Sequence, residues 1–260
     1  FTNSGTEACE LAVKMARKHF HDAGQPERTD IITFSGSFHG RSSAGIAAAG
    51  SEKMTKGFGP LLPGFVHLTF GDHEALNVAV TSPTLAAVLV EPVQGEGGIR
   101  PVPDQCLKGL RDLADEYGFL LIFDEVQCGV GRTGKLFAHE WAGVTPDIMM
   151  VAKGIGGGFP LGAVLATERA ADGMTAGTHG STYGGNPLGC AVGNAVMDII
   201  AQPAFLAEVN RKAGLLRQKL EGLVAGNPDV FTGVRGTGLM LGLLCKATNT
   251  DIVKAGYDAG

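Results

Sequence analysis

Two charged side chains stand at the ends of apolar segments. Asp124 follows the run 120–123, and Lys153 follows the run 148–152 and precedes a glycine-rich stretch. A carboxylate at the dry end of a buried strand is costly unless a cation accompanies it. A desolvated lysine becomes a nucleophilic amine of the kind that forms Schiff bases. Each residue also has a structural alternative, Asp124 as a cap or ion-pair member and Lys153 as a snorkelling side chain.

Two further segments suit the binding of a flat, phosphorylated cofactor. The stretch NSGTEA places Gly5 and Thr6 where a helix begins, and free N–H groups at such an end bind anions. Phe38, in the polar stretch GSFHGR, offers a ring that can stack on a cofactor. With Asp124 for a protonated ring nitrogen and Lys153 for an imine, these parts fit pyridoxal phosphate. We favour that combination over a set of unrelated structural residues.

A second motif competes for the segment after Asp124. Gly129, Gly134 and Lys135 match most of a G-x-x-x-x-G-K phosphate loop, and the apolar run before Asp124 is similar to a Walker B strand. However, Leu136 stands where Ser or Thr must hold magnesium, and the loop does not follow the strand directly. A P-loop nucleotide hydrolase is therefore the weaker alternative, and an ordinary tight loop is favoured.

The composition narrows the classes of partner. The 260 residues are 44% hydrophobic and 18% charged, with a net charge of −5 at pH 7 and no runs of Lys or Arg, which argues against nucleic acid. The five cysteines form no C-x-x-C pair, as expected for reduced thiols in the cytoplasm. The seven histidines show no metal-ligand spacing, so we expect no metal site. No apolar run approaches a membrane span, and no signal peptide is recognisable.

The apolar pattern predicts helices and strands in alternation. A capping box, Ser4-x-x-Glu7, begins a helix with apolar residues at helical spacing. An Ala-rich helix follows the first strand. Such alternation predicts an α/β domain with a mainly parallel sheet. We expect strands at 31–34, 85–90, 119–123, 147–152 and 162–167, the last a candidate for antiparallel orientation, helices at 103–117, 187–201 and 204–225, and a strand pair near 230–245.

The segments that carry chemistry all follow strand ends. They are 35–41, 91–98, 124–127 and Lys153. Ligands of parallel sheets bind beyond the carboxyl ends of the strands. We therefore expect these segments to converge on one crevice.

The pattern also suggests a division into domains. We assign residues 1–200 to a large cofactor-binding domain that lacks its N-terminal part, and 201–260 to the truncated start of a smaller domain. The chain begins at a strand end and stops within a helical pattern, so we expect both ends to be cut from a longer polypeptide.

Several longer motifs resemble one enzyme family. They are NSGTEA, FHGR, EPVQGEGG, FDEVQCGVGRTG, PDIMMVAKGIGGGFPLGA and HGSTYGGNPLGCA, and they extend over nearly the whole chain. They resemble the class III aminotransferases of pyridoxal-phosphate fold type I, and among these most of all the acetylornithine aminotransferases. The resemblance implies a mainly parallel sheet of seven-stranded type flanked by helices, a smaller C-terminal α+β domain, and pyridoxal 5'-phosphate as cofactor.

The resemblance implies a role for each cofactor-binding residue. Lys153 holds the cofactor as a Schiff base and moves a proton between the substrate and cofactor carbons, while Asp124 pairs with the ring nitrogen. The other implied contacts are Gly5 and Thr6 with the phosphate, Phe38 and Val126 on the two ring faces, Gln127 with the phenolic oxygen, Glu125 in the same motif, and Thr182 with the phosphate of the neighbouring subunit's cofactor.

Three residues are implied in substrate binding. Arg41 clamps a substrate carboxylate, Ser181 lies near the substrate, and Glu96 is the switch acid that in the family pairs with a C-terminal arginine. Because Thr182 reaches across, the resemblance implies a homodimer with shared active sites. The chain stops before the arginine partner of Glu96, and Cys9 stands where many members have Asn.

The implied reaction is transamination. It moves the δ-amine of N2-acetyl-L-ornithine to 2-oxoglutarate, giving N-acetyl-L-glutamate 5-semialdehyde and L-glutamate in arginine biosynthesis. Gln127 argues against the glutamate-semialdehyde aminomutases, His39 against eukaryotic ornithine aminotransferases, and Arg41 requires a carboxylate at the non-reacting end. Ornithine, 4-aminobutyrate, succinyl-ornithine and succinyldiaminopimelate are alternative amine donors. A folded but catalytically incompetent fragment is the alternative from another class.

Overall fold

The apolar segments between residues 31 and 167 form the centre of one six-stranded sheet. A computed structural model describes residues 1–260, and every neighbouring pair of strands in it is parallel except β7 and β8. The predicted α/β class, the mainly parallel sheet and the antiparallel last strand are confirmed. In spatial order the strands are β2 (Phe65–Leu68), β1 (Asp30–Phe34), β3 (Leu85–Val90), β6 (Leu120–Asp124), β7 (Ile148–Val151) and β8 (Ala163–Ala166).

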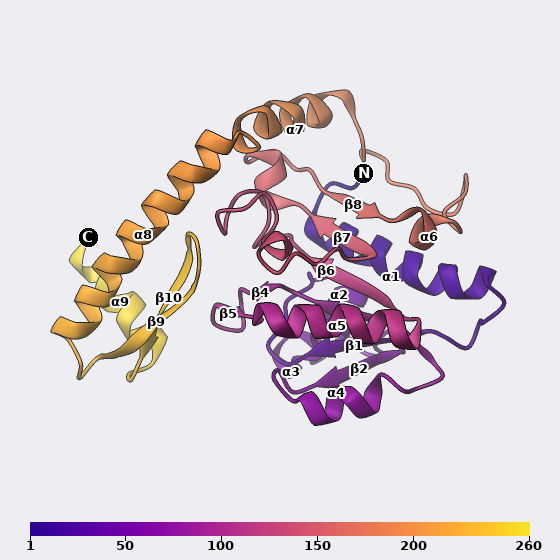
Figure 1. The fold of residues 1–260 in the computed structure, drawn as a ribbon, viewed down its shortest axis with the longest axis horizontal. Coiled ribbons are helices and arrows are strands. Elements are labelled where there is room, and N and C mark those ends of the chain that lie inside the picture. The colour runs from indigo at the N-terminus through magenta and orange to yellow at the C-terminus, as the bar shows by residue number, and fades with distance from the viewer.

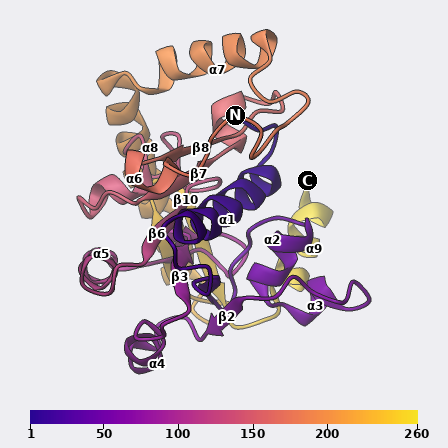
Figure 2. The same cartoon turned by 90° about the vertical axis from the view of Figure 1, so that its right-hand side faces the viewer.

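Helices cover both faces of the sheet, as Figure 2 shows. Alternate residues of a strand point to opposite faces. Leu120 and Ile122 accordingly belong to one core, and Leu121 and Phe123 belong to the other. Because both faces are covered, β3 is buried along its whole length, which explains its continuous apolar run. The helices are α1 (Gly5–Asp22), α2 (Ser43–Ala49) and α6 (Glu168–Ala171) on one face, and α4 (His73–Ala79) and α5 (Asp104–Tyr117) on the other.

Three short elements lack the periodic apolar face that sequence patterns detect. Helix α3 (Glu52–Thr55) buries no side chain, and α4 buries only Leu76. Strand β2 lies at the edge of the sheet, and its two central residues are exposed. The sheet also lacks a seventh strand in this chain, since Thr2 forms only an isolated bridge with Gly162 just before β8.

Two long helices lead away from the sheet (Figure 1). Both α7 (Pro187–Ile200) and α8 (Pro203–Gly226) begin with proline, which suits the first turn of a helix. Beyond them lie the predicted strand pair, β9 (Phe231–Thr237) and β10 (Met240–Cys245), and α9 (Asn249–Ala259). No single helix is long and apolar enough to cross a membrane, although α7 and α8, bent by 69°, pass the length and composition test as a pair.

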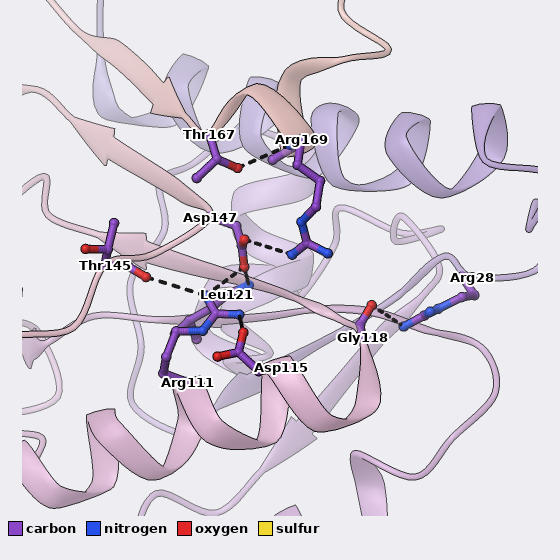
Figure 3. Close-up of polar contacts among 10 residues, drawn as sticks. Arg28, Arg111, Asp115, Gly118, Leu121, Thr145, Asp147, Thr167 and Arg169 are labelled. Carbon is purple, nitrogen blue, oxygen red and sulfur yellow. Dashed lines mark hydrogen bonds and ion pairs between the residues drawn. The ribbon is translucent and has the colours of Figure 1, made fainter.

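Asp147 joins β6, α5 and α6 at the amino end of β7 (Figure 3). Its carboxylate accepts a hydrogen bond from the N–H of Leu121 and pairs with Arg111 and Arg169, all at 2.9 Å. Burial raises the pKa of Asp147, but these donors outweigh it and hold that pKa below its usual value. The ionised form therefore stabilises the fold above the usual carboxyl range, and this contribution is lost as the pH falls through the lowered pKa.

We expect Asp147→Ala to lower the free energy of unfolding by about 3 kcal/mol, because it leaves a buried N–H and two guanidinium groups without their acceptor. Urea denaturation measures this. Asp22→Ala is the matched control, since it removes only surface contacts with Lys18 and His21 and should stay near wild type. Equal effects of the two substitutions would contradict a central role for Asp147.

Candidate active site

The carboxyl ends of the central strands surround a cavity of about 240 Å³. Glu91 follows β3, Asp124 ends β6, and Lys153 follows β7, while the amino end of α1 closes another side. The crevice thus lies where the parallel strands predict it. The predicted site residues that line it are Gly5, Thr6, Phe38, Arg41, Glu96, Asp124, Val126, Gln127 and Lys153.

Asp124 lies buried in the cavity floor. One carboxylate oxygen accepts a hydrogen bond from the N–H of Val126 at 3.0 Å, and the other lies 2.8 Å from Nδ1 of His39. Burial lowers the pKa of His39, but the hydrogen bond and charge of Asp124, with the charge of Glu91, outweigh burial and raise it. The imidazole is thus the side-chain hydrogen-bond partner of the buried Asp124 carboxylate.

Glu91 joins two loops of the cavity. Its carboxylate accepts hydrogen bonds from the N–H of Phe38 at 3.1 Å and from the N–H of Gly95 at 3.3 Å. Burial raises the pKa of Glu91 to about 7; His39 opposes this rise, and Asp124 adds to it. Glu91 therefore titrates near neutrality beneath the site, and its charge depends on the two neighbouring groups.

The amino end of α1 offers free donors to an anion. The N–H groups of Gly5 and Thr6 have no acceptor in the chain. The Thr6 hydroxyl is occupied, since it donates to the Ser42 hydroxyl at 2.9 Å and accepts from the Ser42 N–H at 3.0 Å. A Cβ at Gly5 would come within 2.7 Å of Val126 Cγ1. The backbone donors, rather than the Thr6 side chain, are therefore free for a phosphate.

The helix start itself departs from the predicted capping box. Ser4 accepts from the N–H of Glu7 at 3.3 Å, as expected. The Glu7 carboxylate, however, accepts from the backbone N–H and side-chain amide of Asn3 instead of reaching the N–H of Ser4. Because Asn3 also donates to Ser181, the helix start is linked to the 179–183 segment.

Lys153 begins the 3-10 helix η2 (Lys153–Gly156) in a left-handed conformation, with φ of 45°. A non-glycine residue in this region is uncommon and often marks a functional site. Its side chain is exposed in this chain, which corrects the expectation of a desolvated amine. An apolar run before a lysine does not specify which residues cover its side chain.

The ring-binding residues leave two buried polar atoms without partners. They are Oε1 of Gln127 and Nε2 of His39. Gly95 passes so close to Gln127 that a Cβ there would collide with this oxygen. Buried polar atoms in native proteins nearly always have a partner, so these two atoms have unused hydrogen-bonding capacity beside the cavity. Together with the free N–H groups of α1, they fit a flat heterocycle with a phosphate tail.

The whole chain, residues 1–260, matches the class III aminotransferase family model. The chain belongs to this family. It is 74% identical to an acetylornithine aminotransferase of Rhodobacter capsulatus, across 99% of this chain and 65% of the relative. It is 60% identical to one of Mesorhizobium japonicum, across 97% of this chain and 63% of the relative. The chain therefore spans somewhat less than two thirds of the length of these relatives.

Solved class III aminotransferases share the fold. An ornithine aminotransferase of Toxoplasma gondii superposes with a TM-score of 0.94 at 32% identity, covering 100% of this chain and 63% of that one. An N-acetylornithine aminotransferase of Stenotrophomonas maltophilia superposes with a TM-score of 0.78 at 38% identity, covering 98% of this chain and 61% of that one. The cavity at the strand ends is thus the candidate active site within this fold.

Three residues predicted from the resemblance lie outside this cavity. The Glu125 carboxylate points the other way and accepts hydrogen bonds from the N–H groups of Ala138 and His139, each at 2.8 Å. In this chain Glu125, which directly follows β6, thus supports the loop behind the site and does not line the cavity. Ser181 and Thr182 line a separate cavity beside Asn3 on the surface.

Two residues of the cavity floor, His39 and Glu91, have no role predicted from the sequence. His39 serves there only as a subfamily marker, and Glu91 only as part of a motif. The sequence carries one local signal, since Glu91 directly follows the longest wholly buried strand, but this signal does not specify a role. Their importance becomes visible only when β1, β3 and β6 are placed side by side.

We expect Glu91→Gln to remove part of the pH dependence of stability near neutrality. The pKa of Glu91 is higher in the folded protein than in the unfolded chain. The stability that this difference contributes is present below the usual carboxyl pKa and is lost as the pH rises towards 7. The amide oxygen of the variant can accept only one of the two backbone N–H groups, which bond different carboxylate oxygens in the wild type, and this loss of stability is the same at both pH values. The free energy of unfolding, measured by urea denaturation, should fall less between about pH 5 and about pH 8 in the variant than in wild type. The difference should be up to about 1.4 kcal/mol per pH unit.

The matched control for this experiment is Glu52→Gln on α3, whose side chain is exposed. It should retain the wild-type difference between the two pH values. Identical pH dependence in wild type and Glu91→Gln would show that Glu91 does not titrate in this range.

Proposed function

We propose that this chain is the catalytic part of a pyridoxal-phosphate-dependent acetylornithine aminotransferase. In the proposed reaction, the δ-amine of N2-acetyl-L-ornithine passes to 2-oxoglutarate and yields N-acetyl-L-glutamate 5-semialdehyde and L-glutamate, a step of arginine biosynthesis. The observation that carries the proposal is the convergence of Lys153, Asp124 and the amino end of α1 on one cavity. The 74% identity to an acetylornithine aminotransferase supports the choice of amine donor.

Different residues of the cavity wall would bind different parts of the cofactor. The free N–H groups of Gly5 and Thr6 would bind the phosphate, and Phe38 and Val126 would hold the ring between them. Gln127 would donate to the phenolic oxygen. Pyridoxal phosphate, when bound, supplies an electron sink that stabilises negative charge on the substrate carbon.

Asp124 would keep the ring nitrogen protonated, because His39 and the N–H of Val126 hold its carboxylate in the cavity lining, where its negative charge favours a cation. Lys153 projects from the opposite side of the cavity and would take the proton from the substrate carbon and return it at the cofactor carbon. The exposed lysine end remains mobile enough for both positions, since the following glycines leave it room.

Two charged residues on the cavity wall would select the substrates. Arg41 is exposed, forms no ion pair in this chain, and lies over the Phe38 ring at 5.5 Å. Its guanidinium can therefore bind a substrate carboxylate through two parallel hydrogen bonds. Glu96, also exposed, lies on the same cavity wall and would act as the switch acid for the second carboxylate of 2-oxoglutarate or glutamate.

A homodimer with shared active sites is part of the proposal. Thr182 lies away from the cavity of its own chain and would reach the phosphate of the partner's cofactor, with Ser181 near the substrate. The exposed aromatic side chains of Phe1 and Tyr183 lie near this segment and support a contact surface there.

The proposal includes the domain division and the cellular location. Residues 1–200 would be the large domain and 201–260 the start of the small one, since α8 leads from the sheet to the β9–β10 hairpin. The five free cysteines support the cytoplasm as the compartment. The P-loop alternative loses its basis, because residues 129–135 are followed only by the four-residue η1 (Ala138–Trp141), and Lys135 lies 5.1 Å from the Trp141 ring.

We expect the protein to form N-acetylglutamate semialdehyde from N2-acetylornithine and 2-oxoglutarate. Chromatography of the products measures this reaction. Ornithine, 4-aminobutyrate, succinyl-ornithine and succinyldiaminopimelate should be poorer donors. Lys153→Ala should lower kcat about a thousandfold or more, because no other amine replaces the proton carrier. Lys135→Ala, in the neighbouring glycine-rich loop, is the control and should keep wild-type turnover.

Equal turnover of Lys153→Ala and wild type would refute the lysine assignment. A protein that binds the cofactor but turns over none of these donors would instead be the catalytically incompetent fragment.

A further inference from the structure

Glu96 depends on its loop for its position. Its side chain is exposed on the cavity wall and has no hydrogen-bond or ion-pair partner in the chain. The carboxylate can therefore be placed only through the backbone of the loop 95–99, between β4 (Val93–Gln94) and β5 (Arg100–Pro101). Whatever holds this loop decides where the carboxylate of Glu96 lies.

One side of the loop is fixed to the cavity floor. The N–H of Gly95 donates to Glu91 at 3.3 Å. Arg100 donates to Oε1 of Gln94 at 2.9 Å and to the carbonyl of Ser35. These contacts anchor both ends of the loop to segments that follow β1 and β3.

The other side of the loop is held by the β9–β10 hairpin. Arg235, on β9, donates from its guanidinium to the carbonyl of Gly98. Ile99 packs against an apolar cluster in which Met240 of β10 joins Val93. The hairpin thus contacts the two residues that follow Gly97, close to Glu96 in the chain.

The backbone of Ile99 is strained, and two glycines of the hairpin lie against its side chain. Its φ of 53° lies in the left-handed region, where a β-branched residue is a genuine outlier. A Cβ at Gly236 would lie 2.9 Å from Ile99 Cγ2, and a Cβ at Gly242 would lie 3.1 Å from Ile99 Cγ1. Two glycines therefore leave room for Ile99, and such strain persists only where the surroundings determine it.

We propose that the β9–β10 hairpin positions Glu96 through Arg235 and Ile99, and so sets the discrimination between amine donors with one carboxylate and donors with two. This inference rests on the proposed function, in which Glu96 is the switch acid. Arg235 and Ile99 are positioning residues, since neither lines the cavity. Movement of the hairpin would change the specificity for the second carboxylate without changing Lys153 or Asp124.

The first test compares two amine donors in the donor half-reaction of the cofactor-loaded protein. We expect Arg235→Leu and Gly242→Ala each to lower the ratio of kcat/KM for N2-acetylornithine to that for glutamate by about tenfold. Arg235→Lys, which keeps one donor, should recover part of the ratio. Gly233→Ala is the matched control for the hairpin, since its Cβ would lie at an ordinary 3.7 Å from Leu244 Cδ1.

A second control is Arg211→Leu, at an exposed arginine paired with Glu208 on α8. Both controls should keep the wild-type ratio. An unchanged ratio in Arg235→Leu and Gly242→Ala, or an equal fall in the controls, would overturn the proposal.

The second test measures amide hydrogen exchange and needs no turnover. Exchange at Gly95–Ile99 should become several-fold faster in Arg235→Leu and Gly242→Ala, while exchange in β6 stays at the wild-type rate. Unchanged exchange in the loop would overturn the hairpin contact. If wild type reacts with neither amine, the proposed function fails, and the exchange result alone supports or overturns the positioning of the loop.

Discussion

The buried carboxylate of Asp124 is the constraint on which the site depends. It lies at the end of β6, between strands that are covered on both faces, and only 4% of the residue is exposed. His39 and the N–H of Val126 offset part of the cost, and Glu91 lies close enough for its charge to respond. A buried carboxylate at this position favours a protonated heterocycle beside it, and the free donors of α1 favour a phosphate at the other end of the cavity.

Backbone strain is concentrated near the edges of the same cavity. Lys153 and Ile99 both have left-handed φ angles, although neither is glycine. The sheet beneath them has two continuous apolar cores, which fix the strand ends from which these segments depart. A rigid sheet can therefore hold strained residues at its rim, where the amine and the loop of Glu96 must take specific positions. The hairpin adds a second support that comes from a distant part of the chain.

The sequence predicts the parts of this structure that depend on local patterns. The buried strands β3, β6 and β7 have apolar runs, and Asp124 and Lys153 follow directly from them. The roles of His39 and Glu91 arise only when β1, β3 and β6 pair, so no local pattern contains them. Glu125 adjoins Asp124 in the chain, but its carboxylate bonds to the loop behind the site, which no local pattern indicates. The exposure of Lys153 escaped prediction for a related reason, since an apolar run before a residue does not specify what covers it.

Chemical trapping of the cofactor on its lysine tests the central claim most directly. Pyridoxal phosphate is added to the protein, the complex is reduced with borohydride, and the digested peptides are identified by mass spectrometry. The account predicts a single pyridoxyl label on Lys153, retained in Lys135→Ala and lost in Lys153→Ala. A label on Lys135, or one scattered over surface lysines, would show that Lys153 and Asp124 do not share one cofactor, and would contradict the account.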